Sequence, residues 1–316
     1  MVAFVGLDDP IEISLSGTAQ SFIDYDLDSY IAGLPADVTG VQLRLINTAS
    51  STWSMFGLRK NGSSDSRGND LAPYDHTEAA IGVDSNKIFE LWLEHPSYYD
   101  VFIIGYYCSD AVFFTNGISK IYGIGGWADV SIAGDTGADT AIGVILELCN
   151  NYSGPFGVGF RKNGSTDNRT GGVHEYDSRT AIVGVDASEI YEQYVSNEGL
   201  YIYVSGYIKD GMIFNTNATN YTPGTYGSYV DLSPLPPGAE SAVFEVGSTT
   251  FKAVNFRRKG SSFDKYYDQE HNWFFVPSNV SRICQAKLID SGAPIYLVGY
   301  TVSPVDESAS CSPLMW

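Results

Sequence analysis

The stretch FGLRKNGSSDSR at residues 56–67 returns as GFRKNGSTDNR at residues 159–169, with each shared residue 102 positions later. A Tyr-Asp pair further along the chain keeps the same spacing, at residues 74–75 and 176–177. Because this register holds over about 50 residues, it indicates two copies of one structural unit of roughly 100 residues. The fold of the chain is therefore expected to be the fold of this unit, repeated.

A third copy follows in the same order but is shorter. FRRKGSS at residues 256–262 stands for FRKNGST, and VGY at residues 298–300 stands for the closing segment of the second copy. We therefore predict a lead strand at residues 1–16, repeats at 17–116, 117–221 and 222–303, and a C-terminal tail at 304–316.

Within each unit the hydrophobic pattern has a period of two. GVQLRLI at residues 40–46 and GVILELC at 143–149 alternate as half-buried strands do. Asn-Gly in each KNGS motif favours a two-residue hairpin turn. We predict an all-β chain of three tandem antiparallel β-sandwich or jelly-roll-like units. The stretches at 85–95 and 188–195 fit a short helical turn as well as a strand.

The repeated Arg-Lys pairs are the one recurrent cation cluster in an acidic protein. The repeat motif comprises Arg59, Asn61, Gly62, Asp65, Arg67, Arg161, Asn163, Gly164, Asp167, Arg169, Arg257 and Gly260. In one interpretation, Arg59 and Arg161 lie across their own sandwiches and pair with the repeated Asp65 and Asp167. In the other, these arginines contact another subunit or an anionic glycan.

The chain carries a formal net charge of −19, with an isoelectric point near 4.4. This field repels phosphate backbones and anionic membranes, so we expect neither nucleic acid nor membrane as a partner. Lys+Arg against Asp+Glu number 5 and 16 in residues 1–116, 6 and 12 in 117–221, and 7 and 9 in 222–316. The net charges are therefore −11, −6 and −2. One explanation is that they serve solubility alone, and the other is that the less charged third unit lies against another surface.

Residue types that commonly take part in catalysis or metal binding do not recur at equivalent positions in the units. The four histidines, His76, His95, His174 and His271, occupy different places in their units, and the four cysteines lie far apart. The repeated acids are typical of turns, and oxygen-rich loops such as residues 63–70 lack EF-hand spacing. We expect no catalytic, cofactor or metal site and no enzymatic activity. We expect Cys149 and Cys284 to be buried free thiols and Cys311 to be a candidate for pairing.

The motif F-x-R-K-N-G-S-T-D-x-R, followed by Gly-Val-Asp at 184–186 and Gly-Tyr at 206–207, resembles β-rich modules in structural proteins of tailed bacteriophages and related viruses. The matching modules occur in tail, fibre and capsid-decoration proteins. The third copy departs from this pattern, since it has lost the Asn and the Gly-Val-Asp.

The resemblance implies an oligomeric virion protein that is assembled in the host cytoplasm with other virion proteins. The N-terminus, which does not read as a signal peptide, agrees with this location. We expect assembly through the termini and the third unit. The alternatives are an extracellular array of carbohydrate-binding modules, with exposed tyrosines as platforms for a surface glycan, and a cell-surface filament subunit.

Overall fold

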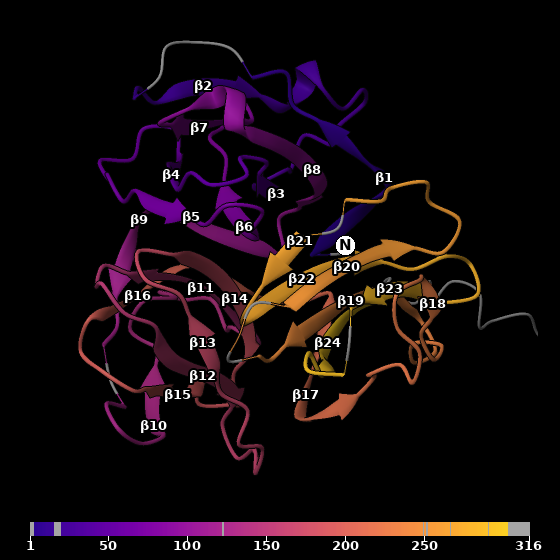
Figure 1. The fold of residues 1–316 in the computed structure, drawn as a ribbon. Helices are drawn as coiled ribbons and strands as arrows, with labels where there is room; N and C mark the ends of the chain where they lie inside the picture. Colours follow the sequence, from indigo (N-terminus) through magenta and orange to yellow (C-terminus); the bar gives the residue numbers. More distant parts are fainter. Residues whose placement is uncertain are drawn as a thin grey trace, which may run out of the picture.

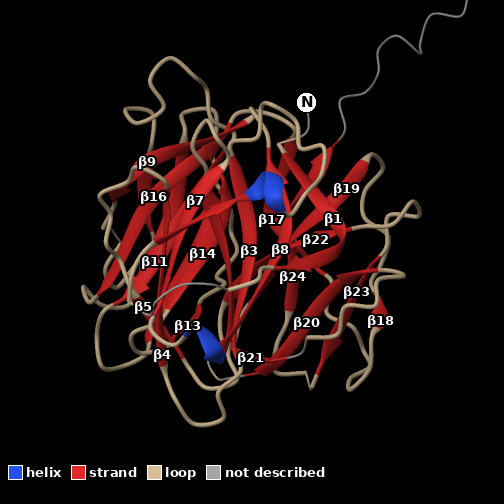
Figure 2. Cartoon of the chain, turned by 90° about the horizontal axis from the view of Figure 1, so that it is seen from above, coloured by secondary structure: helices blue, strands red, loops and turns tan. Residues whose placement is uncertain are grey.

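The computed structural model describes residues 3–15, 20–121, 123–248, 250, 252–265, 267–289 and 291–302. Within them, strands make up almost all of the regular structure, and the two short helices are single 3-10 turns (Figure 2). The chain forms three units that lie side by side around a common centre (Figure 1). None of its helices is long or apolar enough to cross a membrane, as far as the described residues go.

The strands of each unit follow one another in the chain. Unit 1 contains β1 (Phe4–Glu12), β2 (Ile23–Asp26), β3 (Gly40–Asn47), β4 (Ser54–Lys60), β5 (Asn69–Leu71), β6 (His76–Gly82), β7 (Ile88–Leu93) and β8 (Tyr99–Tyr107), with η1 (Leu27–Ser29) and η2 (Pro96–Tyr98). Unit 2 contains β9 (Ala111–Ser119), β10 (Ala128–Ser131), β11 (Gly143–Asn150), β12 (Phe156–Lys162), β13 (Gly171–Val173), β14 (Ser178–Gly184), β15 (Ile190–Val195) and β16 (Leu200–Ile208). Unit 3 contains β17 (Met212–Asn220), β18 (Val230–Asp231), β19 (Ala239–Val246), β20 (Lys252–Arg258), β21 (Tyr267–Gln269), β22 (Asn272–Pro277), β23 (Cys284–Leu288) and β24 (Ile295–Val302).

Each unit is a jelly roll of eight strands in two four-stranded antiparallel sheets. In unit 1 the sheets run β1-β8-β3-β6 and β2-β7-β4-β5. Units 2 and 3 repeat this order, with β9-β16-β11-β14 and β10-β15-β12-β13, and then with β17-β24-β19-β22 and β18-β23-β20-β21. The prediction of three tandem units with one shared topology is confirmed, and the stretches at 85–95 and 188–195 form strands β7 and β15.

The structure moves the boundaries that we drew between the units. Strand β9 pairs with β16, with Val112 opposite Tyr207, so the unit that we began at residue 117 starts before it. Strand β17 likewise pairs with β24, ahead of the predicted boundary at residue 222. The lead strand is the first strand of unit 1, because β1 pairs with β8. The first and last strands of each jelly roll pair although nearly the whole unit separates them in the sequence. Local sequence patterns therefore do not reveal this pairing.

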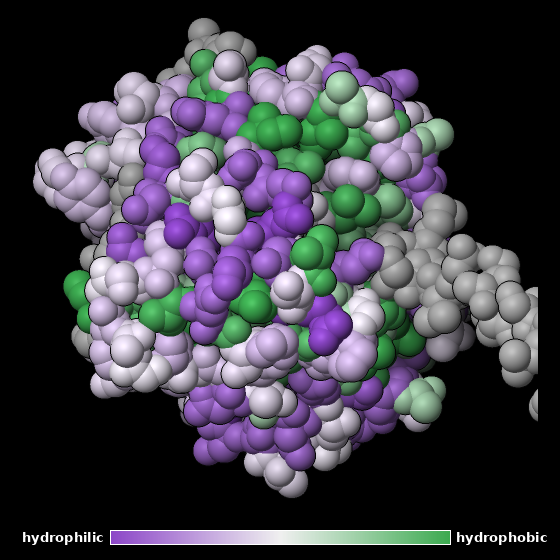
Figure 3. All heavy atoms as spheres, turned by 90° about the vertical axis from the view of Figure 1, so that its right-hand side faces the viewer, coloured by the Kyte–Doolittle hydropathy of each residue, from purple (hydrophilic) through white to green (hydrophobic). Residues whose placement is uncertain are grey.

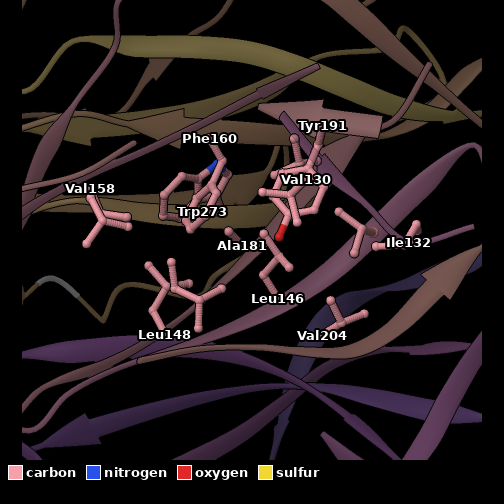
Figure 4. Packing of buried hydrophobic residues seen from close by; sticks show 14 of the residues in the cluster. Val130, Ile132, Leu146, Leu148, Val158, Phe160, Ala181, Tyr191, Val204 and Trp273 are labelled. Carbon is pink, nitrogen blue, oxygen red and sulfur yellow. The ribbon is translucent and has the colours of Figure 1, made fainter. Parts of the chain in front are cut away.

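Each sandwich buries its own apolar core between its two sheets. In unit 2, Leu146 of β11 in one sheet faces Phe160 of β12 and Tyr191 of β15 in the other sheet (Figure 4). Trp273 of β22 reaches in from unit 3, with its ring 5.6 Å from that of Phe160. The core of unit 2 therefore continues into unit 3.

A further apolar cluster lies where the three units meet. Strands β6, β14 and β22 pack against one another there. Equivalent positions on these strands hold Ala80, Ile182 and Phe275, all buried. The chain is thus a closed ring of three units about an approximate threefold axis.

Candidate functional site

The first arginine of the repeat motif makes the same contacts in units 1 and 2. Arg59 forms a bidentate pair with Glu90, directly opposite on the next strand, at 2.7 and 2.8 Å. Arg161 pairs in the same way with Glu192, at 2.9 Å for both contacts. The carbonyl of Asp65 accepts a third hydrogen bond from Arg59 at 3.1 Å. We expected the carboxylate of this Asp to be the partner; a cross-strand glutamate takes that place.

An aromatic ring lies under this arginine in all three units. The guanidinium carbon is 3.8 Å from the ring centre of Phe22 in unit 1 and 4.1 Å from that of Trp127 in unit 2. In unit 3, Arg257 lies 3.6 Å from the ring centre of Tyr229 and bonds to Gln285 instead of a glutamate. Cation–π stacking stiffens the sheet that carries this arginine in each unit, and bidentate pairing adds to it in units 1 and 2.

The Asn-Gly turn of the motif is held by the repeated Gly-Val-Asp. Gly62 has φ +82°, a left-handed conformation that glycine adopts without strain. The side-chain amide of Asn61 donates to Asp84 at 2.9 Å, and that of Asn163 donates to Asp186 at 2.7 Å. These two parts of the repeat therefore recur together because they form one hairpin lock.

The second arginine of the motif crosses to the next unit. Arg67 pairs with Glu147 of unit 2 at 2.6 Å and with Asp65 of its own unit at 2.7 Å. Arg169 pairs in the same way with Glu245 of unit 3 at 2.8 Å and with Asp167. The second arginine of the motif thus joins successive units of one chain, whereas Arg59 and Arg161 pair inside their own units.

The third boundary, from unit 3 back to unit 1, uses other residues. Lys265 pairs with Asp100 at 2.8 Å, and Arg258 pairs with Asp8. Phe263, where units 1 and 2 have Asp65 and Asp167, packs against Phe102 with ring centres 5.2 Å apart. The ring closes by a contact that differs from the other two, so the order of the units is specified.

The apolar contacts between units also differ at the closing boundary. The ring of Phe214 in unit 3 covers Gly143 and Gly184 of unit 2, as Phe113 covers the equivalent glycines of unit 1. At the boundary between units 3 and 1 the glycine and the larger side chain exchange places, because Gly6 of unit 1 faces Pro277 of unit 3.

One buried arginine lies at the meeting point of the three units. Arg179 of β14 bonds to Asp75 of unit 1 at 2.9 Å and to Asp177 of its own unit at 2.7 Å. Glu270 of unit 3 adds a third carboxyl group, which is 4% exposed and interacts electrostatically with Arg179 and Asp75. We call Asp75, Asp177, Arg179 and Glu270 the hub.

Burial dominates the protonation of the hub. It raises the pKa of Glu270 to about 7, against the charge of Arg179. Burial also raises the pKa of Asp177 well above its ordinary value, although Arg179 opposes the shift. We had read Asp75 and Asp177 as turn residues. Arg179 escaped the repeat comparison because Thr77 occupies its position in unit 1.

Two further buried ion pairs, each inside one unit, also bond to a residue of a neighbouring unit. Arg44 of unit 1 pairs with Glu78 at 2.5 Å and also donates to Asn255 of unit 3 at 2.7 Å. Glu245 contacts His271 at 2.9 Å as well as Arg169. Burial would raise the pKa of Glu245, but the hydrogen bond to His271 and the charge of Arg169 lower it below its ordinary value.

The described cysteines and histidines are dispersed. Cys149 and Cys284 are buried free thiols, as predicted, and so is Cys108, whereas Cys311 lies outside the described residues. Within the described part of the chain, no group of three or more His, Cys, Asp or Glu side chains is arranged to hold a metal ion.

Exposed aromatic side chains lie on loops next to the hub, and several of them are at the boundary of units 1 and 2. Tyr74, Tyr152 and Tyr176 are 47%, 59% and 44% exposed, and Trp53 of unit 1 stacks on His174 of unit 2 with ring centres 4.9 Å apart. Tyr74 and Tyr176, which occupy equivalent positions, both have positive φ, at 57° and 58°. That conformation is uncommon for a bulky residue.

No protein-family model matches the chain, and no curated protein matches its sequence. Among solved structures, the chain is similar to one described as "The Triple Jelly Roll Fold and Turret Assembly in an Archaeal Virus", at 13% identity and a TM-score of 0.25, covering 95% of this chain and 89% of that one. It is also similar to the M60 catalytic domain with the CBM51-1 and CBM51-2 domains from Clostridium perfringens ZmpB, at 12% identity and a TM-score of 0.19. That match covers 96% of this chain but only 37% of the other. Both likenesses are too weak to assign a family.

Proposed function

We propose that the protein is a non-enzymatic structural component of a virion, in capsid decoration, tail or fibre, and that its ring of three jelly rolls is a rigid building block. The observation that carries the proposal is the closed ring itself. Buried ion pairs join neighbouring units, including Arg179 of unit 2 with Asp75 of unit 1 and Arg169 of unit 2 with Glu245 of unit 3. A single chain so built offers the geometry of a trimer, the kind of symmetric block from which closed assemblies are made.

The jelly-roll unit supports a structural or binding role. Eight-stranded jelly rolls of this kind form viral capsid and lectin domains. The polar groups at the unit boundaries are engaged in ion pairs that hold the ring, as Arg67 with Glu147 and Arg169 with Glu245 illustrate. We therefore assign these charged clusters to assembly of the fold and not to catalysis.

Unit 3 is the best candidate for the docking surface. It has the smallest net charge, −2 over residues 222–316, so copies of this part repel one another least. It also exposes large apolar side chains at Ile213, Tyr226, Val280 and Ile289. Figure 3 looks onto the side of the molecule formed largely by unit 3, where polar residues surround separate apolar patches. Other copies of the chain and other virion proteins are the proposed partners, with the virion as the location.

Particles from a host that produces the protein provide the test. The full-length chain should be present in fixed stoichiometry in purified particles, and Val280→Asp or removal of residues 304–316 should release it without changing its melting temperature. Asn197→Asp, on an exposed loop of unit 2, serves as the control and should leave incorporation unchanged. A chain that is monomeric at every salt concentration and absent from the particles would falsify the proposal.

Glycan binding outside the cell is the second candidate, favoured by the exposed aromatic patch. The backbone N–H of Tyr176 donates to Tyr152 at 3.3 Å and its carbonyl accepts from Asp70 at 2.7 Å, so the two tyrosines lie on adjoining loops. Exposed aromatic faces next to polar groups suit sugar rings. Soluble protein should then bind a glycan array, and Tyr176→Ala should abolish the signal while Tyr226→Ala retains it. Equal binding by both variants, or no binding by the native chain, counts against this candidate.

A further inference from the structure

The hub brings one cation together with three acids in a site closed to water. Each unit contributes one carboxyl group, Asp75 from unit 1, Asp177 from unit 2 and Glu270 from unit 3, whereas Arg179 is the cation that they share. All four side chains are buried. If every carboxyl group were ionised, the hub would hold two negative charges in excess, which is costly in a site of low dielectric constant.

Two histidines lie close to the hub. His174 of unit 2 is close enough to feel the charge of Arg179, but burial lowers its pKa and so favours its neutral form. His76 follows Asp75 on β6 and packs against the ring of Phe274, 5.6 Å away. One oxygen of Glu270, Oε2, has no hydrogen-bond partner among the described residues. An ionised carboxylate would leave that acceptor unsatisfied, whereas a protonated group places only a neutral atom there.

We propose that the three units close around a bound proton: Glu270 is protonated in the closed ring under mildly acidic conditions, so closure of the ring is linked to proton uptake. This inference goes beyond the proposed virion role and does not depend on it. It makes the hub a built-in sensor of pH at a point where side chains of all three units meet.

The direction of the effect follows from linkage. Glu270 titrates at about 7 in the closed ring, compared with 4.5 for an ordinary glutamate. Between these values the folded chain binds more protons than the unfolded chain, so stability falls as the pH rises through this range. The stabilisation from Glu270 is fully present below the unfolded pKa and is lost as the pH rises through the folded one.

Urea unfolding of the full chain from about pH 5 to about pH 8.5 tests the proposal. For a single linked proton, the unfolding constant of the native chain should rise by up to about tenfold per pH unit below pH 7, relative to Glu270→Gln. Glu198→Gln, on an exposed loop of unit 2, is the matched control and should follow the native curve. Parallel curves for the native chain and Glu270→Gln would overturn the proposal.

A second measurement needs no variant, in case Glu270→Gln fails to fold. The native chain labelled with carboxyl-¹³C glutamate should show the infrared band of a protonated glutamic acid near pH 6, and this band should vanish by about pH 8.5. The isotope shift separates glutamate from Asp177. Burial also raises the pKa of Glu78, so only a labelled band that titrates near pH 7 is assigned to Glu270. Absence of the labelled band near pH 6 would refute proton uptake by Glu270.

Discussion

Gly143→Ala is expected to loosen unit 3 from unit 2. Gly143 begins β11, and a Cβ built on it would lie 2.6 Å from Cζ of Phe214, a ring carbon on β17 of the next unit. Real Cβ atoms do not approach other carbons so closely, and Phe214 is itself buried, so its ring has little room to move. Overpacking of this kind costs about 1–3 kcal/mol.

A double-mutant cycle identifies the ring as the cause. Phe214→Ala alone should cost about 3–5 kcal/mol, because it empties a buried site at the boundary. In the Phe214→Ala background, the added Cβ of Gly143→Ala meets open space, so its cost should fall by at least about 1 kcal/mol. Urea unfolding followed by the fluorescence of buried Trp273, at the same boundary, provides the free energies.

The control is Gly134→Ala, in the loop before β11, where an added Cβ meets no atom within 4 Å. It should change stability by less than about 1 kcal/mol. The packing argument fails if Gly143→Ala is as harmless as the control. It fails equally if the costs of Gly143→Ala and Phe214→Ala simply add.

Three other predictions rest on the charged and buried groups. Arg169→Gln should cost about 3–5 kcal/mol, since it leaves the fully buried Glu245 with a single partner. Amide hydrogen exchange should quicken in unit 3 first, whereas Arg161→Gln should cost less because its partner Glu192 is partly exposed. The depressed pKa of Glu245 stabilises the fold at pH values above 4.5, its unfolded pKa, and this stabilisation is lost as the pH falls. Glu245→Gln should therefore flatten the loss of stability in acid. An unchanged slope would contradict this interpretation. Burial raises the pKa of the thiols at Cys108, Cys149 and Cys284, so a Cys311→Ser variant should react with a thiol reagent only after unfolding.

The repeat and the local patterns of the chain were enough to predict the fold class. Period-two alternation, Asn-Gly turns and the constant register reflect interactions within a strand or between neighbouring strands, which are written locally in the sequence. They predicted three all-β units with one topology, and they placed Arg59 and Arg161 in equivalent environments inside their own units.

The sequence could not show which glutamate would face each motif arginine. Glu90 and Glu192 lie 31 residues beyond Arg59 and Arg161, and only the strand pairing brings them opposite. The same holds for β9 and β17, whose partners are the last strands of their units. Strand pairings between residues so far apart in the sequence depend on closure of the sandwich, and no periodic pattern in the sequence reveals them.

The hub was decided by the tertiary structure alone. Repeats expose what the units share, but Arg179 occupies a position where unit 1 has Thr77 and unit 3 has Asn272. Its partners come from three units, and Glu270 is a glutamate where the other copies have aspartate. Three acids occupy equivalent positions there and repel one another when buried and ionised, so a single unlike residue, Arg179, has to offset them. The sequence therefore determined the unit, and the packing of unlike residues at the axis determined how the three units close.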